Sequence, residues 1–315
     1  MENTENYKKH VSVLFDECLQ GILENKDGEK EEWIADLTFG GGGHSLGFCE
    51  QNPFIKILAL DQDMDAINNG LKVITDRNYQ DRIFLNHDNF KNIQQVIEKN
   101  SLHLLKSQKQ FLGILMDLGV SSHHFDQGER GFSFMNDGSL DMRMNQADDE
   151  SLSAKDVINT YSEVELADII YKYGEEGFSR IIARNIVEKR KEAEVQTTKE
   201  LENIIFHSYP AKLRKGKIHP ATRTFQALRL YVNQELEVLE KTLSVAASLL
   251  RSKGRLAVIS FHSLEDRIVK HEFRRLEKDG SNFKVITKKP IVPKSEEIKR
   301  NFRSRSAKLR ILEHI

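Results

Sequence analysis

The sequence predicts an α/β fold in which a Rossmann-like, mostly parallel sheet carries an inserted all-helical domain. Over residues 33–117, short apolar runs alternate with segments of helical periodicity, a pattern typical of strands joined by crossover helices. Four glycines, Gly40–Gly43, follow the first apolar run, and Asp61 closes the second. A glycine loop after one strand and a carboxylate at the tip of the next are how such a sheet holds a nucleoside.

The elements of the first part follow in a regular order. Apolar residues recur at helical spacing from Val11 to Leu23, which predicts a helix before the first strand. The strand candidates are Trp33–Leu37, Ile55–Leu60, Arg82–Leu85 and Phe111–Asp117, and the helix candidates are His44–Gln51, Met64–Ile74 and Phe90–Lys99.

The pattern changes after the fourth strand. Residues 118–145 are rich in Gly, Ser, His and Asp and predict a long loop. Residues 151–208 show only helical periodicity and predict a helical insertion, which ends in the basic loop Lys212–Lys217. One long helix is then expected from Pro220 towards Leu250, with Gly254 as its end.

Three further strands complete the prediction. Arg255–Ser260 is the fifth apolar strand, and a helix is expected over His262–Leu276. Phe283–Thr287 and Ala307–Leu312 could pair antiparallel. Seven strands that end in an antiparallel pair are the class I methyltransferase variant of the doubly wound fold.

The bulk composition excludes several classes of protein. The chain has 315 residues, of which 39% are hydrophobic and 30% charged, as in ordinary soluble proteins. Its start is polar, and its apolar runs are too short to span a bilayer, so neither a signal peptide nor a membrane segment is expected. Two cysteines, Cys18 and Cys49, indicate neither a disulfide framework nor a zinc cluster. A cytoplasmic location is therefore expected.

Charge is unevenly distributed along the chain. Residues 251–315 carry 18 Lys and Arg against 8 Asp and Glu, whereas the whole chain carries 47 against 48. A basic tail on an acidic body suggests a polyanionic partner. Charge alone, however, favours the simpler interpretation of a solvated surface.

The glycine loop does not match a dinucleotide fingerprint. The pattern G-x-G-x-x-G/A needs Gly or Ala at its last position, where this chain has Ser45 if the pattern starts at Gly40 and Leu46 if it starts at Gly41. Asp36, before the loop, would repel a pyrophosphate but could bind the ammonium of an amino-acid tail, such as that of S-adenosylmethionine. Asp63 is the better helix cap, which leaves Asp61 for ribose hydroxyls. A flexible turn with a capping acid remains the alternative.

The third and fourth strands end in candidate ligand residues. Phe90 could cover an adenine face, or it could be a core residue that opens a helix. Asp117 could accept hydrogen bonds from an exocyclic amine undergoing methylation, or it could bind the cofactor's amino-acid portion. The usual Asp/Asn-Pro-Pro-Tyr/Phe motif is absent there. His123 and His124, with Asp126, could suggest a metal site, but the side chains of neighbouring residues generally point apart and no third ligand is near at conventional spacing, so no metal is predicted.

Several long motifs resemble the MraW/RsmH family, the ribosomal RNA small-subunit methyltransferases H. The matching stretches are Lys9–Leu14, Asp36–Ser45, Met116–Ser122, Glu129–Met135, Leu140–Met144, His219–Arg229, Ser260–Val269 and Arg303–Arg310. The resemblance implies S-adenosylmethionine-dependent methylation of the exocyclic N4 amine of one cytidine in 16S rRNA of the small ribosomal subunit. It also allows a homodimer.

The resemblance implies residues for the site as well. The cofactor contacts would be Gly42, Gly43, His44, Asp61, Phe90, Asp117 and His124, with Asp117 also in the catalytic role. His124 stands where family members usually have Gln, and it can still form a hydrogen bond. His123 replaces the usual Pro, and Asn145 stands where Asp is frequent.

The family also implies a helical domain inserted into the methyltransferase fold. This agrees with a division into residues 1–125, a substrate-recognition insert at 126–217, and residues 218–315. The cations expected to meet RNA are Arg143, Arg223, Arg303 and Arg305. Arg223 could equally serve a structural ion pair.

The sequence also allows two other functions. A nicotinamide-dependent dehydrogenase is disfavoured by the missing third glycine. A non-catalytic RNA-binding or ribosome-assembly protein on the same scaffold would share the basic tail, but an intact cofactor loop favours an enzyme.

Overall fold

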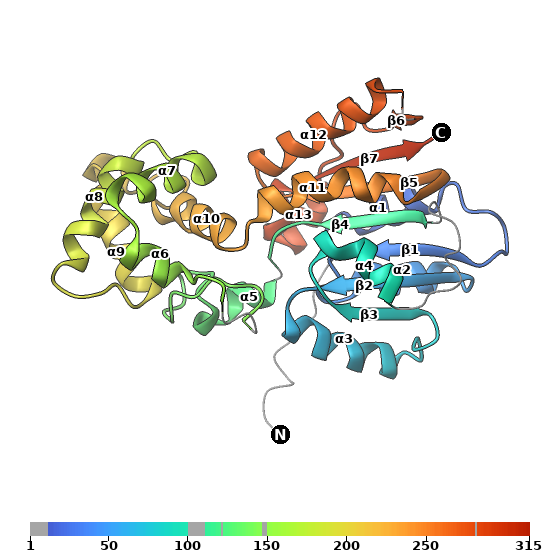
Figure 1. The fold of residues 1–315 in the computed structure, drawn as a ribbon, viewed down its shortest axis with the longest axis horizontal. Coiled ribbons are helices and arrows are strands. Elements are labelled where there is room, and N and C mark those ends of the chain that lie inside the picture. Colours follow the sequence, from blue (N-terminus) through green and yellow to red (C-terminus); the bar gives the residue numbers. More distant parts are fainter. Residues whose placement is uncertain (1–11, 100–110, 121, 147–149, 281) are drawn as a thin grey trace. The chain divides into compact units, whose positions relative to one another are not determined.

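A computed structural model describes residues 12–99, 111–120, 122–146, 150–280 and 282–315, without the side chains of Ser122 and His123 (Figure 1). The chain divides into two compact units. The first, the sheet unit, consists of Met1–Gly119 and Leu236–Ile315, and the second, the helical unit, is Val120–Glu235. The predicted helical positions before residue 12, including Val11, lie outside the described residues.

The sheet unit contains a seven-stranded sheet in the order β3-β2-β1-β4-β5-β7-β6 (Figure 1). The first five strands are parallel, and β7 pairs antiparallel with both β5 and β6. The predicted α/β fold with a mostly parallel, seven-stranded sheet is thus confirmed. The strands are β1 Glu32–Asp36, β2 Ile55–Asp61, β3 Ile83–His87, β4 Phe111–Asp117, β5 Leu250–Ser260, β6 Phe283–Val285 and β7 Lys308–His314.

Helices cover both faces of this sheet because the strands are apolar on both sides. Residues of α1 Phe15–Leu23, α2 Gly43–Gln51 and α3 Met64–Asp76 pack on one face, in a cluster with Ile34 of β1. Residues of α4 Ile93–Lys99, α11 Glu235–Ser248 and α12 Ser263–Lys278 pack on the other, with Trp33 and Ala35. Three short helices complete the unit: η1 Phe90–Asn92, α13 Ser295–Arg300 and η4 Phe302–Ser306.

The helical unit contains no strand among its described residues. Its helices α6, α7 and α9 each begin with a capping box, in which a Ser or Thr hydroxyl and an acidic side chain satisfy the first free N–H groups. The helices are α5 Ser122–Asp126, η2 Gly128–Arg130, α6 Ala154–Thr160, α7 Glu163–Gly174, α8 Ser179–Arg190, α9 Thr198–Ser208, η3 Ala211–Leu213 and α10 Ala221–Val232.

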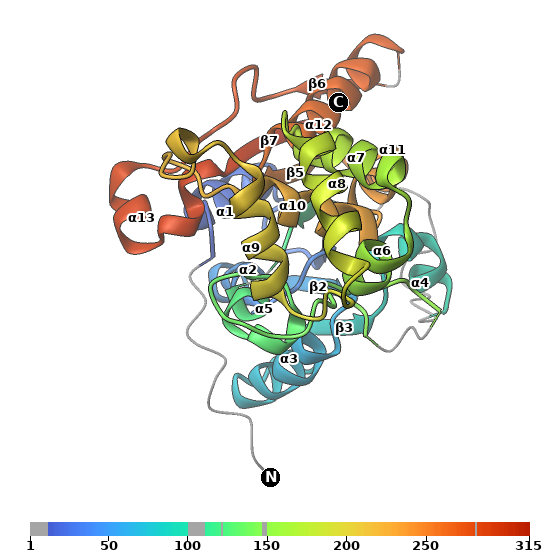
Figure 2. The same ribbon diagram turned by 90° about the vertical axis from the view of Figure 1, so that its left-hand side faces the viewer.

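The helical unit ends later than the expected boundary at residue 217. Helix α10 contacts both α7 and α9, so it belongs to this unit (Figure 2). The single long helix expected from Pro220 is also divided, because Gln234 adopts a left-handed conformation (φ 50°) between α10 and α11. Gly254 does not end a helix, since it lies inside β5.

No helix among the described residues combines the length and the apolar character that crossing a membrane requires.

Candidate functional site

The glycine loop lies between β1 and α2, at the carboxyl end of strand β1. Gly40 and Gly42 have positive φ angles of 53° and 75°, which favour glycine, and Gly42 is the residue before the first turn of α2. A Cβ atom on Gly42 would lie 2.5 Å from the ring of Phe39, and one on Gly43 would lie 2.1 Å from Ser12 Oγ. These three glycines therefore allow a backbone path that larger residues would block.

Asp61 closes β2 and reaches back to this loop. Its Oδ2 accepts a hydrogen bond of 2.7 Å from the Gly40 N–H, and its Oδ1 accepts one of 2.8 Å from the Asp63 N–H. Asp63 caps α3 by accepting from the Asp65 N–H, as predicted. A carboxylate oxygen can accept more than one hydrogen bond, so Asp61 is chemically able to accept from hydroxyls.

Asp36 lies at the end of β1 and is only 1% exposed. It accepts hydrogen bonds from the Ser45 hydroxyl at 2.6 Å and from the Thr38 N–H at 3.2 Å. Burial raises the pKa of Asp36 to about 6, although these two hydrogen bonds oppose the shift. The negative charge of Asp61 adds to the increase.

Asp117 ends β4 with its side chain largely buried at 16% exposure. Its backbone N–H donates to Thr38 Oγ1 at 2.6 Å. Its Oδ1 is buried and has no hydrogen-bond partner among the described residues. Burial raises the pKa of Asp117 well above the usual value, and the charges of Asp36 and Glu265 raise it further. An orphaned buried acceptor of this kind indicates a place for a ligand.

His44 follows the glycine loop directly, and the family resemblance implies that it contacts the cofactor. The structure shows its ring buried, with Nε2 3.1 Å from the Val13 carbonyl and Nδ1 3.9 Å from Asp117 Oδ2. The ring stacks on Phe15 with centroids 5.9 Å apart. His44 thus lies beside Asp117, and its cofactor contact stays a prediction.

Phe90 opens η1 after β3 and is partly buried against the core cluster of α4 and α11. Phe90 therefore occupies the core position that was one of its two predicted roles. A partly exposed ring is still able to offer an edge or face to an adenine, so the second role stays a prediction.

His262 and Glu265, which follow β5, were not predicted from the sequence, and the charge of Glu265 acts on Asp117. Glu265 is 2% exposed, accepts from the Phe261 N–H at 2.8 Å and raises the pKa of Asp117. His262 caps α12 through a capping box with Glu265, and its Nε2 lies 3.1 Å from Glu265 Oε1. The available signal was a strand end followed by His-x-x-Glu, which resembles a capping box.

The cofactor candidate His124 belongs to the helical unit, whereas the glycine loop and Asp117 belong to the sheet unit. His124 is 5% exposed, and its ring lies edge-on to Phe132 with centroids 4.9 Å apart. Its contact with the cofactor stays a prediction. The side chain of His123 lies outside the described residues.

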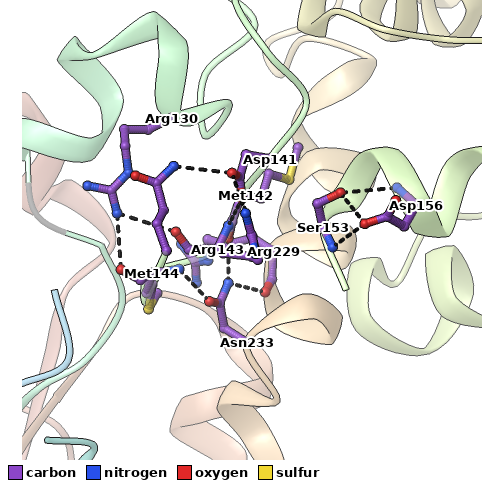
Figure 3. A network of polar contacts seen from close by, with 10 residues as sticks. Arg130, Asp141, Met142, Arg143, Met144, Ser153, Asp156, Arg229 and Asn233 are labelled. Carbon is purple, nitrogen blue, oxygen red and sulfur yellow. Dashed lines mark hydrogen bonds and ion pairs between the residues drawn. The ribbon is translucent and has the colours of Figure 1, made fainter. Parts of the chain in front are cut away.

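Arg143 of the helical unit lies in a polar network around the segment 141–144 (Figure 3). Its guanidinium pairs with Asp141 at 2.8 Å and 3.1 Å. Burial alone would raise the pKa of Asp141, but the hydrogen bonds and charge of Arg143 lower it overall. Asn233 binds the Met142 carbonyl and the Met144 N–H, both at 2.8 Å. The side chain of Arg143, which is 21% exposed, is therefore fixed in place by this ion pair.

The other three predicted RNA-binding arginines are exposed. Arg223 donates to the Glu175 carbonyl at 3.3 Å, at the end of α7. Arg303 and Arg305 lie in η4, where the Arg305 guanidinium stacks over Phe302 at 4.2 Å from the ring centroid. Phe302 itself is 65% exposed.

The neighbouring cations Lys308 and Arg310 differ from Arg303 and Arg305. Both pair with Asp266, at 3.1 Å and 2.7 Å. Burial would raise the pKa of Asp266, but these two cations lower it overall. The basic tail thus contains exposed arginines before β7 and cations within β7 that join this strand to α12.

A search for related families matches the model of the MraW methylase family over residues 7–315. The chain belongs to the MraW methylase family. Two relatives named ribosomal RNA small subunit methyltransferase H support this membership. One, from Acaryochloris marina, is 48% identical over 97% of this chain and 94% of its own length. Another, from Clostridium botulinum strain Kyoto, is 44% identical over 98% of this chain and 99% of its own.

Among solved structures, a crystal structure of a putative rRNA-methylase from Clostridium thermocellum aligns with this MraW-family chain with a TM-score of 0.46. Its sequence identity is 13%, and the alignment covers 97% of this chain and 99% of that one.

Proposed function

We propose that this MraW-family protein transfers a methyl group from S-adenosylmethionine to the exocyclic N4 amine of a cytidine in 16S rRNA. The relatives named above are small-subunit rRNA methyltransferases by name and match nearly the whole chain, which supports rRNA as the substrate. The proposal that the methylated group is an amine rests on Asp117, whose buried Oδ1 is an unused acceptor at the end of β4. An amine N–H is the donor that such an acceptor needs.

The residues of the sheet unit fit the proposed cofactor. The glycine loop turns at Gly40 and Gly42, whose positive φ angles disfavour any residue that carries a side chain. Asp61 has acceptor capacity for ribose hydroxyls, and Asp36 is a buried carboxylate suited to an ammonium. When bound, S-adenosylmethionine would supply a methyl group on a sulfonium, which is a good leaving group.

The mechanism follows from what Asp117 can do to the amine. The cytidine N4 lone pair conjugates with the ring and is a weak nucleophile. Hydrogen bonds from the amine to Asp117 would orient it and localise that lone pair, so most of the rate would come from positioning. Asp117 must be ionised to accept with both oxygens, and the positive charge of a bound sulfonium would favour the ionised form against the raised pKa.

The RNA would meet cations outside this site. Arg303 and Arg305 are exposed beside Phe302, an arrangement that suits phosphate contacts and base stacking. Arg143 and Arg223 are the corresponding candidates on the helical unit. The small ribosomal subunit in the cytoplasm is the proposed setting.

The proposed reaction is tested on cellular rRNA. We expect 16S rRNA from cells that lack this protein to miss one N4-methylcytidine modification when the rRNA is digested and analysed by mass spectrometry. Re-expression of the wild-type chain should restore it. A complete set of methylcytidines in the deficient cells would contradict the proposal. Binding to small subunits without any cofactor-dependent methyl transfer would favour the non-catalytic alternative.

The raised pKa of Asp36 predicts how cofactor affinity depends on pH. An ammonium binds the ionised carboxylate, and the free group is protonated below about pH 6. Affinity should therefore be nearly constant above pH 7 and fall about tenfold by pH 5, because binding must then expel a proton. Calorimetric titration between pH 5 and pH 8 measures this.

The matched variant for this prediction is Asp36→Asn, which cannot titrate. It should bind S-adenosylmethionine more weakly at pH 8 and show a flatter pH profile than the wild type. An unchanged tenfold loss in Asp36→Asn would assign the titration to another group.

A further inference from the structure

The stretch 203–234 of the helical unit contains no Asp or Glu, although 48 of the 315 residues are acidic. It runs from the middle of α9 through η3 to the residues just after α10. Six cations lie within it, namely Lys212, Arg214, Lys215, Lys217, Arg223 and Arg229. Three of them are lysines of the loop Lys212–Lys217. These lysines belong neither to the proposed catalytic site nor to the residues predicted to bind RNA.

The start of this loop is held by Arg214. The Arg214 guanidinium donates to the Tyr209 carbonyl at 2.9 Å and to the His207 carbonyl at 3.2 Å, and so satisfies free acceptors at the end of α9. It also lies over the ring of Phe206, 5.4 Å from the centroid. Arg214 is thus a structural cation of the loop.

The exit of the loop is held by His219. Its ring stacks between Phe134 and Phe206, with centroids 4.7 Å and 5.9 Å away and interplanar angles of 24° and 22°. Its Nδ1 accepts from the Ala221 N–H at 3.2 Å, and its Nε2 lies 3.3 Å from Glu202 Oε1. Both ends of the loop are therefore anchored in a column of aromatic rings.

The three lysines of this loop face solvent. Lys212, Lys215 and Lys217 are exposed, and no described residue forms a hydrogen bond or an ion pair with their ammonium groups. By contrast, exposed lysines elsewhere in the same unit have acidic partners, such as Lys189 with Glu192 and Lys191 with Glu188, both at 2.7 Å. An anchored set of like charges without counter-charges repels itself and attracts a polyanion.

We propose that the loop Lys212–Lys217 is a docking surface for the phosphate backbone of RNA. The anchors limit the freedom that the loop would lose on binding, which favours association. Its cations are lysines, which suit phosphates as point charges and read no base sequence. The docking surface would hold the substrate strand independently of the catalytic carboxylates. This inference rests on the proposed function for its choice of RNA as the polyanion.

The test measures the salt dependence of RNA binding without cofactor. The probe is a fluorescently labelled, single-stranded RNA oligonucleotide of mixed sequence, titrated between 50 mM and 200 mM KCl. Each lost phosphate contact lowers the slope of log K against log salt by about 0.7, so K212Q/K215Q/K217Q should lower it by about 2. Raising the salt fourfold should then weaken wild-type binding about 20-fold more than it weakens binding by the variant.

The matched control is K155Q/K189Q/K191Q, which removes the same charge from lysines of the same unit that each lie within 4.0 Å of a carboxylate. It should leave the slope near the wild-type value. Equal slopes for the wild type and K212Q/K215Q/K217Q, with both proteins folded by circular dichroism, would overturn the docking surface. Because methyl transfer is not measured, this outcome is separate from a failure of the proposed reaction, which a complete set of methylcytidines in the deficient cells would reveal.

Discussion

Replacing Asp117 with Asn is expected to lower the rate of methyl transfer by about 100-fold, because one oriented acceptor at a reacting centre contributes about that much. The substitution keeps the size of the side chain, but removes the charge and replaces one of the two acceptor oxygens with an N–H₂ donor. Single-turnover transfer of labelled methyl groups to small-subunit rRNA measures the rate. Calorimetry on the same variant measures cofactor affinity.

The two readouts separate the roles that the sequence left open for Asp117. A large loss of rate with cofactor affinity within about threefold would assign Asp117 to the amine, since such a change in affinity is below 1 kcal/mol. A large loss of affinity would assign it to the amino-acid portion of the cofactor. Asp76→Asn, at an exposed position in α3, is the charge-matched control. A nearly active Asp117→Asn variant would contradict the catalytic role.

Replacing Asp61 with Ala is expected to weaken S-adenosylmethionine binding by about 10- to 100-fold. Hydrogen bonds to a charged group contribute about 1.5–3 kcal/mol, which corresponds to that range of Kd. The loss includes the loop itself, because Asp61 also accepts from the Gly40 N–H. Equilibrium dialysis with labelled cofactor measures the affinity.

The variant Asp61→Asn controls for the structural part of this effect. It retains one oxygen, which can still accept from the Gly40 N–H, and should lie between the wild type and Asp61→Ala. Thermal unfolding of both variants shows whether the sheet unit stays folded. Unchanged affinity in Asp61→Ala would show that the ribose is not at this strand end.

The strands of the sheet could be predicted because their apolar runs are visible locally. Phe111–Asp117 was predicted with its observed bounds, and the cap at Asp63 follows from its place one residue before a helix. The break between α10 and α11 could not be predicted. It accompanies the binding of Met142 and Met144 by Asn233, a contact between segments about 90 residues apart that leaves no local signal.

The residues of the candidate site likewise include some that a sequence pattern reveals and some that it does not. The glycine loop and Asp61 carry a spacing that can be read directly, and the structure joins them through the Gly40 N–H. Glu265 was missed because its contribution is electrostatic and depends on burial next to Asp117, and burial of an acid is not visible in a single sequence. A capping acid in a helix is the ordinary interpretation of that residue.

The ring of Phe39 links the glycine loop to a helix that follows the next strand. A Cβ atom on Gly70 of α3 would lie 2.5 Å from this ring and 2.6 Å from Leu85, while one on Gly42 would also meet the ring at 2.5 Å. A larger residue at position 70 is therefore expected to require smaller side chains at both 39 and 85. Position 42 has no such compensating partner, because its φ of 75° would strain any side chain even with the ring removed. In the course of evolution the loop would thus be free to change its packing but not its turn.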